Sequence, residues 1–269
     1  MLIRAAYDIA YECAAETPML AMLHVRPERR GDLTALERFA VLPHTPYRQY
    51  QDGFGNICTR LVMPAGITRF TCDFTVRDDG RPDIIPDGAR QVPVDLLPDD
   101  VIVFLLGSRY CDTDRLGDLA WSLFRYFDPG WPRVRAIAHY VHQRITFGYQ
   151  YARADRTAWQ AHEERVGVCR DFAHLAVALC RCMNIPARYC TGYLGDIGVP
   201  ADPAPMDFSA WFDVYLDGAW YTCDARHNQP RIGRILMARG RDATDTAIST
   251  AFGTATLKGF KVATEQVDA

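Results

Sequence analysis

The stretch CRDFAHLAVALCRCMN, residues 169–184, limits the fold more than any other part of this chain. Phe172, Leu175 and Leu179 recur at helical spacing, and apolar residues occupy much of the remaining circumference. A helix that is apolar nearly all round has to be enclosed by protein on every side. The segment is therefore predicted to be a central, buried helix, which ends before Pro186.

The segments around this helix predict the fold class. Two amphipathic helical patterns precede it and three strand-like segments follow it, in residues 112–127, 131–149, 187–194, 208–216 and 219–225. Asp217 and Gly218 lie between the last two segments and favour a two-residue hairpin turn. Antiparallel strands packed on a central helix make this half of the chain an α+β structure.

The first ninety residues are rich in short strand patterns. These patterns occupy residues 19–25, 37–42, 47–52, 56–63 and 68–76. In the last of them Phe70, Cys72 and Phe74 share one face, so an antiparallel β-sandwich or open barrel is predicted. A linker rich in proline and aspartate follows at residues 77–100. We therefore expect an N-terminal β domain at 1–88 and an α+β core at 89–269.

The composition is that of an ordinary globular protein, and it narrows the class of partner. The formal net charge of -3 gives no reason to expect nucleic acid, and no apolar run is long enough to span a bilayer. Arg4, Asp8 and Glu12 interrupt the stretch where a signal peptide would need apolar residues. A cytoplasmic protein without a membrane partner is therefore expected.

The nine cysteines are predicted to be mostly free, buried thiols, as is usual in a reducing cytosol. No C-x-x-C pair occurs, and Cys180 and Cys182 would point about 200° apart on a helix. We therefore expect neither a metal site nor another cofactor. Core packing is predicted for Cys13, Cys58, Cys72, Cys180, Cys182, Cys190 and Cys223.

Cys169 differs from these residues because it lies where the buried helix begins, two residues after Gly167. The unpaired N–H groups of a helix start favour negative charge, so they lower the pKa of a thiol placed there. They can also donate to a developing oxyanion. A catalytic nucleophile and a buried core thiol are both consistent with this position.

The segment RVGVCRDFAHLAVALCRCMNIPARYCTGYL, followed by DFSAWFDVYLDGAWYTCDARHN, resembles the core of the bacterial transglutaminase-like superfamily. The strand-rich N-terminal third resembles the β domain that precedes this core in many members, so the resemblance covers essentially the whole chain. It implies a papain-like fold and a Cys–His–Asp triad that transfers acyl groups from amides through a thioester. By this resemblance Cys169 is the nucleophile and Asp224 orients the base.

The chain departs from the family at the base, because members usually carry histidine in an H-A-W segment where this chain has Ser209. A two-residue turn places Trp211 opposite Asp224, so residue 209 shares the Asp224 face of the hairpin. Serine cannot replace imidazole as a proton acceptor at neutral pH. Trp211 and Asp213 lie on the same face and are predicted to contact substrate, although Asp213 can also be an exposed strand carboxylate.

His227 is the histidine nearest to Asp224 in sequence, but in a straight strand it falls on the opposite face. It can serve as a substitute base if the strand ends or bulges after Asp224, and otherwise it is a structural histidine. His162, in the segment that leads to the buried helix, is a second candidate.

Three other histidines fit structural roles better. His174 is about 140° around the helix from Cys169, which favours a buried or hydrogen-bonded position. His139 and His142 lie one helical turn apart without an identified third metal ligand, which favours a polar helix face.

Five arginines in residues 226–241 indicate a solvated face, with an anionic substrate pocket as the alternative.

Two functions are consistent with these residues. The first is a cysteine hydrolase or acyltransferase that acts on peptide or side-chain amide bonds of a peptide or protein substrate, through a thioester at Cys169. The second is a catalytically degenerate binding or assembly module, which Ser209 at the position of the base favours. The substrate, the choice between hydrolysis and transamidation, and the oligomeric state are left open.

Overall fold

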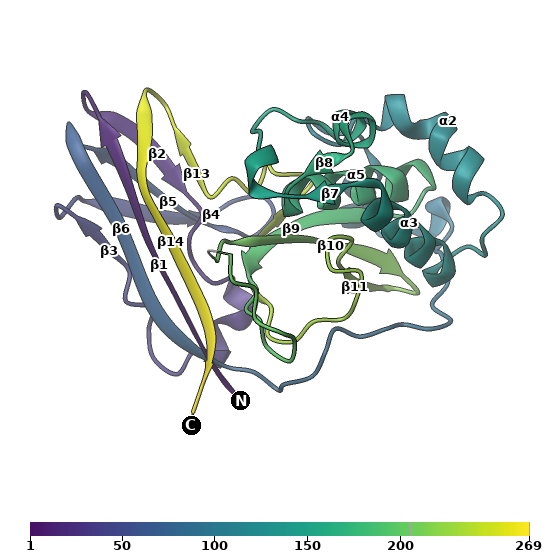
Figure 1. Cartoon of the computed structure of the whole chain (residues 1–269), viewed down its shortest axis with the longest axis horizontal. Helices are drawn as coiled ribbons and strands as arrows, with labels where there is room; N and C mark the ends of the chain where they lie inside the picture. Colours follow the sequence, from purple (N-terminus) through teal and green to yellow (C-terminus); the bar gives the residue numbers. More distant parts are fainter. Residues whose placement is uncertain (205, 269) are drawn as a thin grey trace.

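A computed structural model describes residues 1–204 and 206–268, and it places a β-sandwich beside a half that contains helices and a further sheet (Figure 1). Within the described residues the sandwich consists of sheets with the strand orders β14-β1-β6-β3 and β13-β2-β5-β4. Its strands are β1 (Leu2–Cys13), β2 (Thr17–Ala21), β3 (Ala40–Leu42), β4 (Tyr47–Gln51), β5 (Ile57–Met63), β6 (Gly66–Arg77), β13 (Ser249–Ala251) and β14 (Ala255–Val267). The predicted antiparallel sandwich is therefore confirmed.

Strand β1 was not predicted, although it pairs along its whole length with both β6 and β14. Strand β14 comes from the C-terminal end of the chain and forms an edge of this sheet, as the yellow strand of Figure 1 shows. Strand β13 joins the other sheet through β2. The segment 89–269 thus contributes strands to both halves, so the expected division at residue 88 does not separate two continuous units.

The second half is built around the predicted buried helix, α5 (Cys169–Cys182). The other helices are α1 (Asp99–Ile102), α2 (Thr113–Phe124), α3 (Trp131–Arg144) and α4 (Ala158–Glu164). The main sheet has the order β11-β10-β9-β12, and its strands are β9 (Ala187–Tyr193), β10 (Ser209–Leu216), β11 (Ala219–Cys223) and β12 (Ile235–Gly240). The short strands β7 (Thr146–Phe147) and β8 (Val166–Gly167) pair in parallel. The predicted α+β architecture is confirmed.

The two faces of the main sheet pack against different parts of the molecule. Phe212 and Val214 of β10 lie in one hydrophobic cluster with the buried residues of α5. Tyr193 of β9 and Ile235 of β12 lie in a second cluster with the interior of the sandwich. The sheet therefore lies between α5 and the sandwich.

His174 of α5 is fully buried and confirms the expected structural role. Its ring stacks on Tyr110 with 5.1 Å between ring centroids, and Nε2 accepts the Ala243 N–H at 3.1 Å. Burial lowers the pKa of His174 to about 3, and the nearby Arg170 charge acts in the same direction. The ring is therefore neutral in the folded protein at neutral pH.

We expect acid to destabilise the fold partly through His174. An unfolded histidine gains its proton near pH 6.5, and the folded one stays neutral to much lower pH. The unfolded state therefore binds the extra proton, and stability falls by about 1.4 kcal/mol per pH unit below about pH 6. Urea unfolding at a series of pH values should show a shallower loss for His174→Gln, and parallel pH profiles for the two proteins would contradict this account.

Candidate functional site

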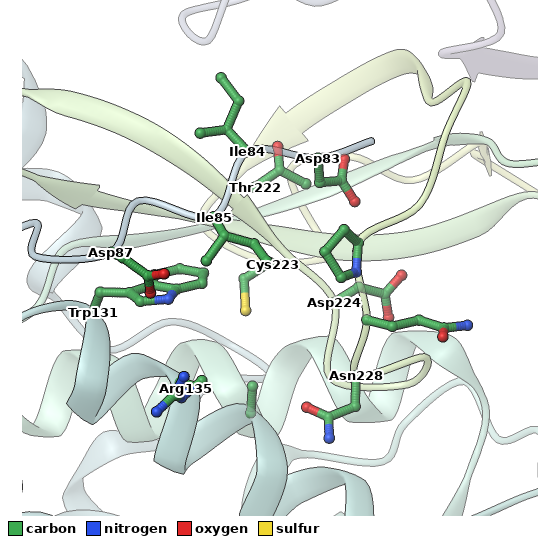
Figure 2. A pocket seen from close by; sticks show the side chains of 13 residues that line it. Asp83, Ile84, Ile85, Asp87, Trp131, Arg135, Thr222, Cys223, Asp224 and Asn228 are labelled. Carbon is green, nitrogen blue, oxygen red and sulfur yellow. The ribbon is translucent and has the colours of Figure 1, made fainter. Parts of the chain in front are cut away.

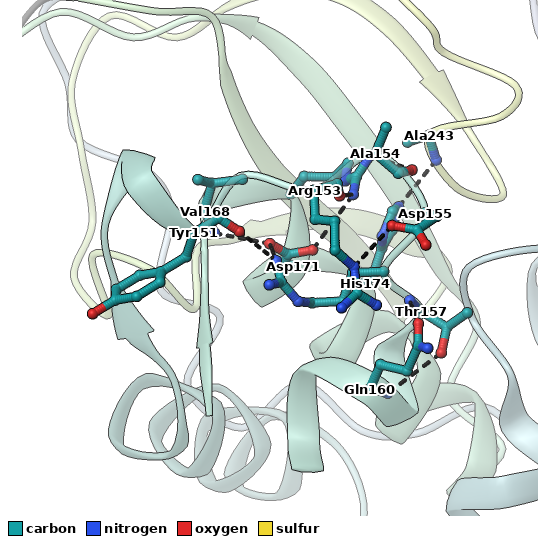
Figure 3. Close-up of polar contacts among 12 residues, drawn as sticks. Tyr151, Arg153, Ala154, Asp155, Thr157, Gln160, Val168, Asp171, His174 and Ala243 are labelled. Atoms are coloured by element: carbon teal, nitrogen blue, oxygen red, sulfur yellow. Dashed lines mark hydrogen bonds and ion pairs between the residues drawn. The ribbon is translucent and has the colours of Figure 1, made fainter. Parts of the chain in front are cut away.

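A buried polar cluster fixes the start of α5 and with it Cys169 (Figure 3). Oδ2 of the fully buried Asp171 accepts the Val168 N–H at 2.8 Å and the Arg156 Nη1–H at 3.1 Å. Gly167 is required here, because a Cβ at that position would lie 2.7 Å from the Asp171 Cβ. The helix start is therefore held by two buried side chains.

Cys169 is half-buried, and its Sγ lies 3.9 Å from the Phe208 carbonyl oxygen. Burial raises the pKa of the thiol to about 12, and Asp207 adds to the rise, whereas the Arg226 guanidinium opposes it. The prediction that the helix start lowers the thiol pKa is therefore wrong in this structure. The loss of hydration around the sulfur outweighs the Arg226 charge and the Ala210 backbone hydrogen bond, which both favour the thiolate.

The hairpin that carries Asp224 has the predicted register. Leu216 pairs with Ala219 and Val214 with Tyr221, as the two-residue turn requires. Strand β11 ends at Cys223, so Asp224 is the first residue beyond the strand, and residues 225–227 form a turn. The chain therefore bends back directly after Asp224.

This turn brings His227 onto Asp224. The Nδ1–H of His227 donates to Asp224 Oδ2 at 2.9 Å, and the backbone N–H of His227 donates to Asp224 Oδ1 at 3.0 Å. The carboxylate fixes the tautomer, so Nε2 of the neutral ring is free to accept a proton. The strand ends where the substitute-base hypothesis for His227 requires it to end.

The Asp224 carboxylate is buried and receives a second charged donor. The Nη2–H of Arg234 reaches the same Oδ2 at 2.9 Å. Burial alone would raise the pKa of Asp224, but the Arg234 charge and the His227 hydrogen bonds hold that pKa well below its usual range. Asp224 is therefore ionised beside the imidazole throughout the physiological pH range.

Ser209 and His227 line the same cavity, which has a volume of about 70 Å³. Ser209 is buried, and its Oγ has no hydrogen-bond partner among residues 1–204 and 206–268. Tyr149, Asp207 and Arg226 also line this cavity, and the sequence offered no pattern that selects them. Burial raises the pKa of Asp207. Ser209, at the predicted position of the base, and His227, its proposed substitute, therefore line one small, polar cavity.

A larger cavity of about 250 Å³ lies on another side of Asp224 (Figure 2). Ile85 of the linker, Trp131 and Arg135 of α3, and Cys223 contribute to its lining. Cys223 is only half-buried and its sulfur points into this space. Its predicted place in the core is corrected to a place on a cavity wall, because β11 is an edge strand of its sheet.

His162, the second candidate for the base, makes contacts that give it a structural role. His162 is buried on α4, where its Nδ1 lies 3.2 Å from the Tyr140 hydroxyl and its Nε2 3.2 Å from Arg144 Nη2. His142 Nδ1 donates to the Arg226 carbonyl at 2.9 Å, and His139 Nδ1 lies 3.2 Å from Asn228 Nδ2. These contacts leave His227 as the candidate that combines a carboxylate partner with the cavity beside Ser209.

Trp211 and Asp213 are both buried, and neither lines the cavity beside His227. Arg188 Nε and the Thr222 hydroxyl donate to the Asp213 carboxylate, each at 2.9 Å. The Trp211 ring lies beneath the Arg234 guanidinium, 4.9 Å from ring centroid to carbon. The alternative of an exposed carboxylate is wrong for Asp213, and the geometry gives no support to a substrate contact by either side chain.

The five arginines of residues 226–241 do not form a solvated face. Arg231 forms an ion pair with Asp196, and Arg234 forms ion pairs with both Asp83 and Asp224. Arg239 forms an ion pair with Glu28, and Arg241 forms one with Asp245. Arg226 lies over the Phe147 ring at 3.8 Å. Acidic partners account for the charges of these four arginines, and Arg226 lines the cavity beside His227.

Residues 1–204 and 206–268 contain no cluster of three or more His, Cys, Asp or Glu side chains arranged to hold a metal ion. Across the same described residues, no helix has both the length and the apolar character needed to cross a membrane.

Known proteins are similar to this chain over part or all of its length. Residues 125–225 match the model of the transglutaminase-like superfamily. A candidate cysteine protease from Cytophaga hutchinsonii has a similar solved structure, with a TM-score of 0.86 and 29% identity, over 100% of this chain and 91% of that chain. The periplasmic domain of TgpA from Pseudomonas aeruginosa is 12% identical with a TM-score of 0.41, over 83% of this chain and 90% of that chain.

An uncharacterized protein of Mycobacterium leprae is 35% identical over 83 residues, which are 30% of this chain and 30% of that relative. The match thus spans less than a third of the relative's length. A central helix packed on an antiparallel sheet and joined to a β-sandwich places the chain in a transglutaminase-like α+β class of fold. Over residues 125–225 the chain is similar to the transglutaminase-like superfamily.

Proposed function

We propose that this protein is a cysteine hydrolase or acyltransferase that acts on peptide or side-chain amide bonds, with Cys169 as nucleophile and His227 as base. The observation that carries the proposal is the hydrogen bond between His227 and Asp224, together with the place of His227 in the lining of the cavity beside Ser209, the usual position of the family's histidine. The cysteine protease candidate from Cytophaga hutchinsonii, similar over the whole chain, supports a peptide or protein substrate.

The raised pKa of Cys169 favours a reaction that starts from the neutral thiol. As the sulfur attacks the amide carbonyl carbon, the thiol proton moves to Nε2 of His227, and Asp224 stabilises the resulting imidazolium. N–H groups at the start of α5 donate to the oxyanion of the tetrahedral intermediate. His227 then returns the proton to the leaving amine, which leaves a thioester on Cys169. Water or another amine attacks the thioester and releases the product.

A histidine introduced at the usual position tests this assignment of the base. Ser209→His should restore at least about tenfold of the activity lost in His227→Gln, because both rings adjoin the same cavity. The measurement is kcat/KM for a peptide amide or thioester substrate in both single variants and the double variant. If Ser209→His raises the activity of the natural chain but not that of His227→Gln, the cavity beside Ser209 is not the site of proton transfer.

The second candidate function is a binding or assembly module on a degenerate scaffold. The raised thiol pKa and Ser209 at the position of the base are the observations in its favour. The two functions differ in one measurable respect. A binding module keeps its partner when Cys169 is replaced by alanine and never forms a covalent bond through that sulfur, whereas the enzyme forms a thioester there.

A further inference from the structure

Asp83 lies in the linker between the sandwich and the helical half, and it is joined closely to the segment between β11 and β12. The Asp83 N–H donates to the Arg231 carbonyl at 2.9 Å, and the Arg231 N–H donates to Asp83 Oδ2 at 2.9 Å. Pro82 and Ile232 form an antiparallel bridge beside these bonds. The Asp83 side chain, 15% exposed, is therefore fixed next to Arg234 by backbone contacts on both sides.

Arg234 connects this linker residue to the catalytic carboxylate. Its Nε–H donates to both Asp83 oxygens, at 3.0 and 2.9 Å, while its Nη2–H donates to Asp224 Oδ2. The guanidinium is nearly buried and lies on the Trp211 ring. A planar guanidinium can hold two carboxylates in fixed directions in this way, which the ammonium group of a lysine cannot do.

The charges along this chain of contacts alternate from Asp83 through Arg234 and Asp224 to the His227 ring. Without Asp83, the Arg234 charge would compensate Asp224 fully and weaken its attraction for an imidazolium. Without Arg234, the buried Asp224 would lose a hydrogen-bond donor that fixes its second oxygen. Each member thus affects both the orientation and the charge that the next one presents.

We propose that Asp83 and Arg234 form a positioning pair, through which the inter-domain linker sets the direction and effective charge of Asp224 toward His227. The catalytic consequence of this pair rests on the proposed function, whereas its effect on the His227 ring does not. Neither residue lies in the segment of residues 125–225 that matches the superfamily model, so the pair is a feature outside that matched core.

Several other groups surround the His227 ring and stay unchanged in the test. From the cavity side these are Tyr149, Asp196, Asp202, Asp207, Arg226 and Arg231. From α3, His139 and His142 contact the backbone or side chains of the same turn. Their charges act equally on every variant, so a difference between variants reports the altered pair.

The experiment is the pH titration of the His227 ring by NMR in the full chain, with its resonances assigned from His227→Gln. Asp83→Asn should move the titration midpoint to lower pH by about 0.5 to 1 unit, because a negative charge is lost. Arg234→Met should move it to higher pH, and the double variant should return close to the natural chain. Asp245→Asn removes a comparable partner of Arg241 away from the site and should cause no shift.

Each result decides between a positioning pair and ordinary structural support. Shifts of opposite sign that cancel in the double variant support the pair, and equal shifts in all variants or none would overturn it. A fall in melting temperature without a movement of the midpoint also overturns it. If the shifts cancel but Cys169 never becomes acylated, the pair stands and the proposed catalytic function is wrong.

Discussion

Replacing Cys169 by alanine is expected to lower the turnover of amide or thioester substrates by at least about 10,000-fold, because no other group can form the acyl-enzyme. Residual turnover would come from substrate binding and oxyanion donors alone. The fold should persist, since Cys169 is half-buried and its Sγ has only a long contact with the Phe208 carbonyl. The measurement is kcat/KM, with circular dichroism as the check on folding.

Cys182→Ala is the matched control for this change. Cys182 is also half-buried on α5, at the opposite end of the helix, and its Sγ contacts the Thr113 carbonyl. It should keep activity within about twofold, since it has no place in the proposed chemistry. Undiminished activity in Cys169→Ala would show that the nucleophile has been assigned wrongly.

Replacing His227 by glutamine should cost about 100- to 10,000-fold in kcat, the usual contribution of a general base. The glutamine amide can still donate to Asp224, so the change removes proton transfer with little loss of structure. KM should change much less than kcat, because the ring takes part in the transition state more than in binding. Steady-state kinetics on a peptide amide substrate measures both constants.

His44→Gln provides the comparison for the His227 change, because His44 is exposed in the sandwich, in the segment between β3 and β4. It should leave both constants unchanged. If His227→Gln behaves like His44→Gln, the base lies elsewhere, and the thioester mechanism needs a different proton acceptor.

The fold was largely predictable because its strongest signals are local. The all-round apolar pattern of α5 and the Asp-Gly turn of the β10–β11 hairpin each indicate one element without reference to distant residues. β1, β12, β13 and β14 were not predicted. β14 is mostly exposed at a sheet edge, where one polar face and few core contacts weaken the alternation that identifies a strand. Its pairing with β1 is also remote in sequence.

The candidate site was predictable in its frame but not in its electrostatics. The positions of Cys169 and Asp224 follow from a helix start and a hairpin register. The contact between His227 and Asp224 depends on a turn that sequence periodicity cannot specify. The raised pKa of Cys169 depends on how closely several segments surround the sulfur, and the partnership of Arg234 with Asp83 joins residues 151 positions apart.

The central claim, that Cys169 forms an acyl-enzyme with help from His227, is tested most directly by trapping that intermediate. The protein is incubated briefly with p-nitrophenyl acetate at neutral pH, quenched in acid and digested, and each cysteine peptide is examined by mass spectrometry. We expect acetylation of Cys169 well ahead of Cys182, and at least about tenfold slower acetylation of Cys169 in His227→Gln. Acetylation of Cys169 no faster than of Cys182, or at the same rate in His227→Gln, would contradict the claim.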